Sequence, residues 1–354
     1  MRRIGIMTFL HNENYGSILQ AWALQKTLES LGFEAEHIDY APSRKEKVLN
    51  LLRSGNSPML ILEGMRKRSA TGQMRGGFDE FRREHLATSA TCHDRAALKA
   101  VAARYDAVIC GSDQIWSPVW LNPAYFLDYT DRPKISYAPS LGVAELPAPR
   151  KQKRIASLVK GFEAVSVREA EGAALLRQMA GVEAAVMPDP VMLVPQEQWR
   201  SLMPCSEERE RYVLCYFIGD DASYWERVRE AAQQEGCAVR VIPRTEGARQ
   251  AGHPLEEDVP PGRWLSLLDG AARVVTDSFH AAAFSAILNT PCTILRRSRE
   301  DDPESKNSRI DQLMRTLGVT ALEAESWQRV NEAVRAQAEK GRNWLLGALS
   351  QATR

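Results

Sequence analysis

The sequence lacks the features that would place it in a membrane, a disulfide scaffold or a zinc protein. No apolar stretch is long enough to span a bilayer, no C-x-x-C pair occurs, and no H-x-x-H links its dispersed histidines. The six cysteines are scattered at positions 92, 110, 205, 215, 237 and 292. We therefore predict free thiols, no metal site and a cytoplasmic location.

Three further absences limit which ligands and which cellular location the sequence predicts. The net charge is +1 over 354 residues, so no excess of positive charge attracts nucleic acid. The first loop, HNENYGS, does not carry the G-x-G-x-x-G pattern of dinucleotide-binding folds. The N-terminal residues show no signal-peptide pattern of an apolar core with a small-residue cleavage site. Nucleic acid is therefore not expected as a partner, and we expect no secretory leader.

Alternating strand and helix patterns predict an α/β protein. Residues 3–9 and 33–39 are strand-like, and residues 17–31 between them carry apolar side chains at helical spacing before Gly32. Such a β-α-β unit requires a parallel sheet. We predict two Rossmann-like, doubly wound domains over residues 1–187 and 188–325, followed by a C-terminal helix over residues 326–354. Prolines between Pro188 and Pro195 mark the junction.

A basic segment from residue 41 to about 95 interrupts the first domain. Its pattern is helical, lysine and arginine outnumber the acids, and leucines such as Leu49 and Leu52 add apolar patches. A solvated helical insertion would explain this pattern, and so would an amphipathic surface that lies on anionic lipid. The sequence leaves both interpretations open, the second of which implies peripheral contact with the inner face of a membrane.

Polar residues follow several predicted strands of the first domain. The loop with Asn14 and Tyr15 precedes a helix, so it is either a ligand loop or an ordinary helix cap. Three polar residues follow the strand that ends at Cys110: Ser112, Asp113 and Gln114. Trp116, Trp120 and Tyr125 come next and provide either flat surfaces for a sugar or core packing.

Arg168 directly follows a further predicted strand of this domain. An arginine at such a position can clamp a carboxylate or phosphate, or it can pair with Glu169 or Glu171 in a surface salt bridge.

The stretch from Arg273 to Arg296 reads as strand, polar turn, small-residue helix and strand. Its turn contains Ser278 and His280 where a strand gives way to a helix, and open α/β sheets bind ligands at such places. The alternative is that Ser278 only caps the helix and that His280 is a core histidine. Lys306 and Arg309 lie downstream and add two cations.

Two such domains joined by a stiff junction would face each other across a cleft, as in GT-B-type glycosyltransferases. The predicted cleft collects several cations, one histidine and few acids. This set suits an anionic donor and a proton transfer.

Ordered motifs identify a family resemblance over most of the chain. These motifs are FLHNENYGSILQAWALQKTLESLG, GSDQIW, YFLDY, KISYAPSLG, VSVREAEG, DPVML, TDSFHAAAFSAILNTPCTIL and NSRIDQL. Together they resemble the polysaccharide pyruvyl transferase family. The resemblance implies a GT-B-like fold and transfer of the enolpyruvyl group of phosphoenolpyruvate to a sugar, with a pyruvate ketal and phosphate as products. Phosphoenolpyruvate would be the donor substrate, and no cofactor is implied. The acceptor would be a sugar of a cell-surface polysaccharide, in many cases while still linked to lipid.

The resemblance also suggests roles for single residues. Arg168, Lys306 and Arg309 would hold the donor's anionic groups, with His280 as acid and base. Asp113 would orient or deprotonate the acceptor hydroxyl, which places the acceptor in the first domain and the donor in the second. One departure stands out: many relatives have an arginine two residues before the motif histidine, in a pattern that resembles R-L-H, whereas here Ser278 occupies that position. Either Lys306 and Arg309 replace that arginine, or this branch uses a different donor.

Two alternatives of different class stay open at the level of sequence. One is a GT-B-type glycosyltransferase that uses a nucleotide-sugar. The other is a non-catalytic scaffold in a polysaccharide assembly complex, with the basic segment as its contact surface.

Overall fold

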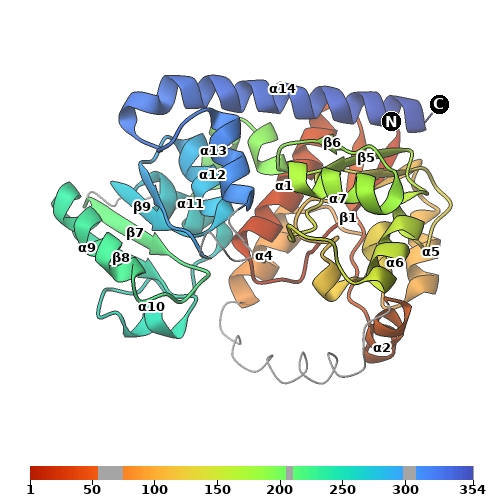
Figure 1. Ribbon diagram of the computed structural model, residues 1–354, viewed down its shortest axis with the longest axis horizontal. Helices are drawn as coiled ribbons and strands as arrows, with labels where there is room; N and C mark the ends of the chain where they lie inside the picture. The colour runs from red at the N-terminus through yellow and green to blue at the C-terminus, as the bar shows by residue number, and fades with distance from the viewer. Residues whose placement is uncertain (55–74, 205–209, 298–307, 354) are drawn as a thin grey trace. The chain divides into compact units, whose positions relative to one another are not determined.

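The computed structural model describes residues 1–54, 75–204, 210–297 and 308–353 (Figure 1). The chain forms two compact units. Unit 1 comprises residues 1–75, 82–193 and 339–354, and unit 2 comprises residues 76–81 and 194–338.

Unit 1 is built around a six-stranded parallel sheet with the strand order β2-β1-β3-β4-β5-β6. Its strands are β1 (Arg3–Met7), β2 (Glu34–His37), β3 (Ala107–Cys110), β4 (Lys134–Ser136), β5 (Ala164–Val167) and β6 (Ala185–Val186). The sheet order reverses between β1 and β3, because β1 continues to β2 on one side and β3 lies on the other. Ligands of open α/β sheets bind beside such a reversal, at the carboxyl ends of the strands.

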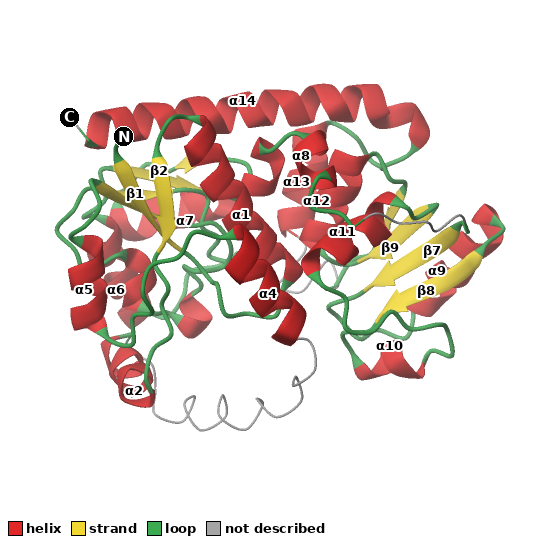
Figure 2. Ribbon diagram, turned by 180° about the vertical axis from the view of Figure 1, so that it is seen from behind, coloured by secondary structure: helices red, strands yellow, loops and turns green. Residues whose placement is uncertain are grey.

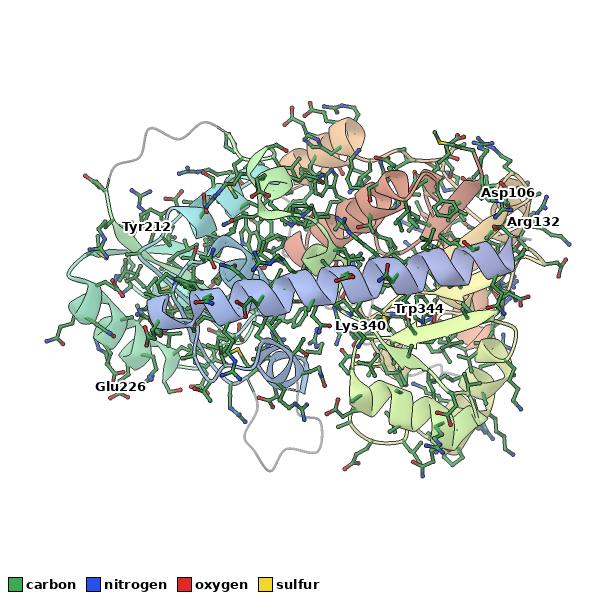
Figure 3. The ribbon with its side chains drawn as sticks, turned by 90° about the horizontal axis from the view of Figure 1, so that it is seen from above. Asp106, Arg132, Tyr212, Glu226, Lys340 and Trp344 are labelled. Carbon is green, nitrogen blue, oxygen red and sulfur yellow. The ribbon has the colours of Figure 1, made fainter. Side chains whose placement is uncertain are left out.

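Helices cover both faces of this sheet (Figure 2). On one face, Met7, Val108 and Cys110 pack with apolar side chains of α5 (Arg95–Ala102), α6 (Pro149–Val159) and α7 (Ala170–Ala180). On the other face, Ile4 and Ile109 pack with α1 (Tyr15–Ser30) and with the end of α14 (Trp327–Ala352). Trp344 of α14, labelled in Figure 3, lies with its ring centroid 5.9 Å from that of Tyr137. The prediction of a doubly wound α/β unit is confirmed.

The first helix begins two residues earlier than the sequence pattern predicts. The side chain of Asn14 accepts a hydrogen bond from the backbone N–H of Ser17, so the helix starts at Tyr15. It ends before Gly32, whose φ of 87° lies in the left-handed region that glycine adopts without strain. The predicted C-terminal glycine is therefore in place.

Unit 2 contains a four-stranded parallel sheet with the order β10-β9-β7-β8. Its strands are β7 (Tyr212–Tyr216), β8 (Ala238–Ile242), β9 (Arg273–Thr276) and β10 (Cys292–Ile294). The helix α9 (Tyr224–Glu235) covers one face, and α11 (Pro261–Asp269) packs beside α12 (Phe279–Leu288), which contacts β9 (Figure 1). The order reverses between β7 and β9, so this unit also has a switch point at its carboxyl edge.

The remaining described elements are short or lie outside the two sheets. They are α2 (Arg44–Arg53), α4 (Arg75–His85), η1 (Pro118–Trp120), η2 (Pro123–Phe126), η3 (Pro190–Leu193), α8 (Gln196–Arg200), α10 (Glu246–Gln250), α13 (Ser308–Leu317) and η4 (Ala324–Ser326). None of the helices in the described part of the chain is both long and apolar enough to cross a bilayer.

The unit boundaries differ from the predicted domain boundaries. The first unit extends to Leu193 because η3 contacts α1, whereas the sequence places the junction after residue 187. The predicted C-terminal helix is present, but its residues up to Ala338 belong to unit 2 and those from Glu339 to unit 1. Of the predicted basic segment, α2 and α4 are described, and residues 55–74 lie outside the described residues.

Candidate active site

A buried glutamine ties together the carboxyl ends of β1 and β3 in unit 1. The Gln20 side-chain nitrogen donates to Thr8 Oγ1 at 2.9 Å and to the Ser17 carbonyl at 2.8 Å, and its oxygen accepts from the Ser112 N–H at 2.8 Å. Gln20 is completely buried. The contact with Ser112 fixes the loop after β3 against α1, and the contact with Thr8 fixes the end of β1 against the same helix.

This framework positions Asp113 with little freedom. One carboxylate oxygen accepts from the Gln114 N–H at 2.7 Å, and the other accepts from the Ser17 hydroxyl. The Asp113 carbonyl accepts from the Ser140 N–H at 2.8 Å. With φ at 69°, Asp113 adopts a left-handed conformation that few residues other than glycine, asparagine and aspartate tolerate. Its carboxylate is therefore held at the switch point of unit 1.

Gly111 makes the turn before Asp113 possible. Its φ is 129°, and a Cβ atom at this position would lie 2.0 Å from the Tyr137 carbonyl oxygen. No other residue fits there without moving the neighbouring chain.

Arg168 lies at the end of β5 in a buried ion pair. Its Nη1 is 2.6 Å from Asp189 Oδ2, its Nε is 3.3 Å from Glu169 Oε1, and it is 4% exposed. Burial alone would lower its pKa, but Glu169, Asp189 and Asp113 outweigh this and raise it. The salt bridge that the sequence allows as an alternative is present, and it is buried. This placement favours a structural role for Arg168, and its predicted contact with the donor stays a prediction.

The other predicted residues of unit 1 are buried or half-buried. Ser112 is buried and donates to the Ala138 carbonyl at 2.6 Å, and Tyr15 is buried too. Asn14 caps α1. Gln114 lies half-buried beside the site, and its backbone carbonyl accepts a hydrogen bond from the Trp120 indole N–H at 3.2 Å.

The aromatic residues after β3 have different surroundings. Trp116 is buried and stacks on Phe126 with ring centroids 4.8 Å apart, so it belongs to the core. Tyr125 is half-buried and meets Phe9 edge-on at 4.9 Å. Trp120 is 50% exposed, although its indole nitrogen is bound by Gln114. Trp120 therefore keeps a flat apolar face toward solvent next to Gln114.

In unit 2 the switch point is organised by Asp277. Its carboxylate accepts from the N–H groups of Ile218 and Gly219, both at 2.7 Å, and from Arg297 Nε at 3.1 Å. Arg297 Nη2 also donates to the Asp277 carbonyl at 3.0 Å. Asp277 is 1% exposed, so it joins the ends of β7 and β9 to the segment after β10 from a buried position.

Ser278 and His280 follow Asp277 at the start of α12. The Ser278 hydroxyl accepts from the Ala281 N–H at 3.4 Å, so it caps the helix as the simpler interpretation predicts. His280 lies in the first turn, is 8% exposed, and its ring meets Phe279 edge-on at 5.0 Å. Both residues lie at the carboxyl edge of the unit 2 sheet. They lie in unit 2 and Asp113 lies in unit 1.

Two predicted residues, Lys306 and Arg309, follow β10 in the sequence. Lys306 lies outside the described residues, and Arg309 is half-buried in α13. A pocket of about 320 Å³ in unit 2 runs along β10 and α13 and is lined by Arg227, Arg296 and Asp311, among others. None of the predicted site residues lines it.

Sequence reasoning did not predict which residues hold these loops in place. Ser17, Gln20 and Asp189 support the site in unit 1, and Asp277 and Arg297 support the site in unit 2. Signals were present, since Asp189 lies in the motif DPVML and Asp277 in TDSFH. The sequence contains no comparable signal for Arg297.

The solved structures similar to this chain include sugar-nucleotide enzymes of the GT-B fold. The UDP-GlcNAc 2-epimerase from Neisseria meningitidis bound to UDP-GlcNAc is 10% identical with a TM-score of 0.50, over 99% of this chain and 100% of that one. The S. aureus MnaA–UDP co-structure is 11% identical with a TM-score of 0.51, over 95% of this chain and 87% of that one. At this identity the likeness shows the fold, and it confirms the predicted GT-B-like class. No curated protein matches the chain.

A family model agrees with the ordered motifs. The model described as "Polysaccharide pyruvyl transferase" matches residues 14–299, a span that contains both switch points. This span is well over half of the chain. The chain therefore belongs to the polysaccharide pyruvyl transferase family of enzymes.

Proposed function

We propose that this enzyme transfers the enolpyruvyl group of phosphoenolpyruvate to a sugar of a cell-surface polysaccharide or its lipid-linked precursor. The product is a pyruvate ketal, and phosphate is released. The family match over residues 14–299 carries the proposal. The placement of Asp113 and His280, each at the switch point of its unit, supports it.

The reaction requires two proton transfers and two new C–O bonds. A proton adds to the methylene carbon of the donor, which leaves an oxocarbenium-like carbon that a sugar hydroxyl attacks. A second hydroxyl of the same sugar then displaces phosphate. One hydroxyl proton is balanced by the new methyl group, and the other leaves with phosphate. Two titratable groups, an acid and a base, are therefore needed.

His280 and Asp113 fill these roles in the proposal. His280 protonates the methylene carbon, since an imidazole ring can both donate and accept a proton at a reacting atom. Asp113 orients and deprotonates the attacking hydroxyl. The hydrogen bonds from Ser17 and Gln114 support this role because they fix the direction of the carboxylate.

The acceptor sugar would stack on Trp120. Sugar rings present apolar C–H faces that pack on indole rings, and Trp120 combines an exposed ring with a fixed indole nitrogen. The ring belongs to the same loop as Gln114 and Asp113. Of the three aromatic residues suggested by the sequence, Trp120 best suits this contact.

A lipid-linked acceptor would bring the enzyme to a membrane surface, and α2 suits such contact. Val48 and Leu52 lie one turn apart on α2 and are 51% and 65% exposed. Arg44, Lys45 and Lys47 are exposed beside them. A helix that presents basic and apolar side chains together binds anionic lipid surfaces.

Glycosyl transfer from a nucleotide-sugar is the second candidate. It is favoured by the fold neighbours, which are described with UDP-GlcNAc and UDP, and by Ser278 in place of an arginine. The family match favours pyruvyl transfer instead.

Thermal unfolding separates the two candidates without knowledge of the acceptor. The protein is heated with phosphoenolpyruvate, with UDP-GlcNAc, or with neither. A ligand at ten times its dissociation constant adds roughly 1.4 kcal/mol to the free energy of unfolding, which raises the midpoint measurably. A shift with phosphoenolpyruvate alone supports the proposal. A shift with UDP-GlcNAc alone would contradict it and favour glycosyl transfer.

A further inference from the structure

Two arginines that the sequence analysis did not single out lie at the carboxyl edge of the unit 2 sheet. Arg244 follows β8 by two residues, and Arg297 follows β10 by three. Both side chains are half-buried. They flank the switch point between β7 and β9, where Asp277 and His280 also lie. Two guanidinium groups at the ligand-binding edge of an open sheet indicate an anionic ligand.

Arg297 is oriented by Asp277. It donates to the carboxylate of Asp277 through Nε and to the carbonyl through Nη2. The same carboxylate accepts two backbone N–H groups, from Ile218 and Gly219, and its negative charge is therefore shared among three donors. These two hydrogen bonds to Asp277 fix the plane of the Arg297 guanidinium group.

Gly219 allows this close packing. A Cβ atom at Gly219 would lie 2.9 Å from Asp277 Oδ2 and 3.2 Å from Arg297 Cγ. Any larger residue would push the carboxylate or the arginine stem away. The turn after β7 is thus fitted closely around the Asp277–Arg297 pair.

Arg244 lies within electrostatic range of the end of β7, as Asp277 and Arg297 do. Burial raises the pKa of Tyr216 to about 12, while Arg244 and Arg297 lower it and Asp277 raises it, so all three charges lie within electrostatic range of the Tyr216 hydroxyl. The nearby Asp220 is exposed and accepts from the Thr245 hydroxyl at 3.0 Å at the start of α10.

We propose that Arg244 and Arg297 bind the two anionic groups, carboxylate and phosphate, of the donor phosphoenolpyruvate. This inference rests on the proposed function. Guanidinium groups bind carboxylate and phosphate in a bidentate manner, and a donor with both groups requires two of them. The pair takes the place of the arginine that Ser278 replaces, and Asp277 is a positioning residue for Arg297.

Titration calorimetry with phosphoenolpyruvate tests the proposal on the full chain. Arg244→Ala and Arg297→Ala are each expected to raise the dissociation constant roughly ten- to a hundredfold, because each removes a charged hydrogen-bond donor. Arg229→Ala is the matched control, since Arg229 is an exposed arginine of α9 in the same unit. The control is expected to bind phosphoenolpyruvate as the wild type does.

Lysine variants distinguish a loss of ligand binding from a loss of folding. Arg297→Ala also removes a partner of Asp277, whereas Arg297→Lys keeps the charge and loses the planar fork. With thermal unfolding midpoints near the wild-type value, we expect Arg244→Lys and Arg297→Lys to bind with intermediate affinity. Wild-type affinity in folded Arg244→Ala and Arg297→Ala would overturn the inference while the proposed function stands. A wild-type protein that does not bind phosphoenolpyruvate would overturn both.

Discussion

Arg168 Nη1 lies 2.6 Å from Asp189 Oδ2, and both side chains are almost completely buried. Breaking a buried ion pair by removing one partner leaves an uncompensated charge away from water. Arg168→Ala should therefore lower the free energy of unfolding by about 3–5 kcal/mol, measured by urea denaturation. This loss is expected whether or not Arg168 also contacts the donor.

An exposed ion pair provides the control for Arg168. Arg177 lies 3.0 Å from Glu183, and the two side chains are 74% and 75% exposed. Arg177→Ala should cost at most about 1 kcal/mol. If Arg168→Ala proved as stable as Arg177→Ala and failed to bind phosphoenolpyruvate, a donor contact would explain Arg168 better than a structural role.

The His280 imidazole should be required for transfer and dispensable for folding. A general acid contributes roughly 10²–10⁴-fold to a rate, so His280→Gln should lower the pyruvate content of the cell-surface polymer to background when it is the sole copy in cells. Purified His280→Gln should still show the midpoint shift with phosphoenolpyruvate.

His253 offers a matched substitution in the same unit. It is half-buried and stacks on Trp225 with ring centroids 5.8 Å apart. His253→Gln should leave the polymer's pyruvate content unchanged. Normal pyruvate content in cells with His280→Gln would remove His280 from the mechanism.

The sequence pattern identified the loops of both candidate sites but not the contacts that support those loops. A polar loop after a buried strand is a local pattern, and it led to Asp113 and His280. The partners of these loops come from distant segments: Ser17 reaches Asp113, and Arg297 reaches Asp277. Such pairings depend on tertiary packing, which strand and helix periodicity does not encode.

The same limit applies to Arg168 and to helix boundaries. The position of Arg168 after a strand predicted either a ligand clamp or a surface salt bridge. Only the folded structure brings Asp189, which follows β6, into contact with Arg168. Likewise α1 begins at Tyr15, because the side chain of Asn14 caps it, whereas hydrophobic periodicity placed the start at Ser17.

Trp120 should contribute to sugar binding and not to donor binding. In saturation-transfer NMR with methyl glycosides of glucose, galactose and mannose, Trp120→Ala should weaken binding of the accepted sugar roughly five- to tenfold. Trp120→Phe keeps a smaller ring and should retain part of the affinity. The midpoint shift with phosphoenolpyruvate should be the same in all three proteins.

The neighbouring Val119 controls for general loss of exposed apolar surface. Val119 is 59% exposed and belongs to the same short helix, η1. Val119→Ser should bind the glycosides as the wild type does. Equal binding by Trp120→Ala and wild type would show that the acceptor does not stack on this ring.

Stability should fall at acidic pH in part through His37. His37 is fully buried on β2, and burial lowers its pKa to about 3, an effect that the nearby Ala21 backbone offsets in part. The unfolded chain binds a proton at His37 near pH 6.5, whereas the folded protein does not bind it until about pH 3. The free energy of unfolding therefore decreases as the pH falls below 6.5, by roughly 2 kcal/mol at pH 5 from this group alone.

Replacing His37 by an apolar residue should flatten this dependence. Urea denaturation of His37→Leu at pH 7 and pH 5 should show a smaller decrease than in the wild type. His253→Gln, which changes a half-buried histidine, should keep the wild-type difference. An unchanged difference in His37→Leu would mean that His37 does not contribute to the acid sensitivity.

The exposed face of α2 should bind anionic membranes. The opposite face of this helix is attached to the rest of unit 1, because Asn50 donates to the Tyr40 hydroxyl at 2.6 Å. Within the helix, Arg53 lies 2.7 Å from the buried Glu46. Because α2 is fixed in this way, Val48 and Leu52 are presented outward with three basic residues beside them. The protein should co-sediment with vesicles that contain phosphatidylglycerol and not with neutral phosphatidylcholine vesicles.

Two variants separate this face from general surface effects. Val48→Glu combined with Leu52→Glu should abolish co-sedimentation, since it removes apolar contact and adds charges that anionic lipid repels. Leu346→Glu places the same charge at a 42% exposed leucine of α14 and should sediment as the wild type does. Added salt should release the wild type, because each basic residue near the surface contributes about 1 kcal/mol of screened attraction. Equal sedimentation with both kinds of vesicle would rule out the electrostatic part of the contact and leave α2 as a solvated insertion.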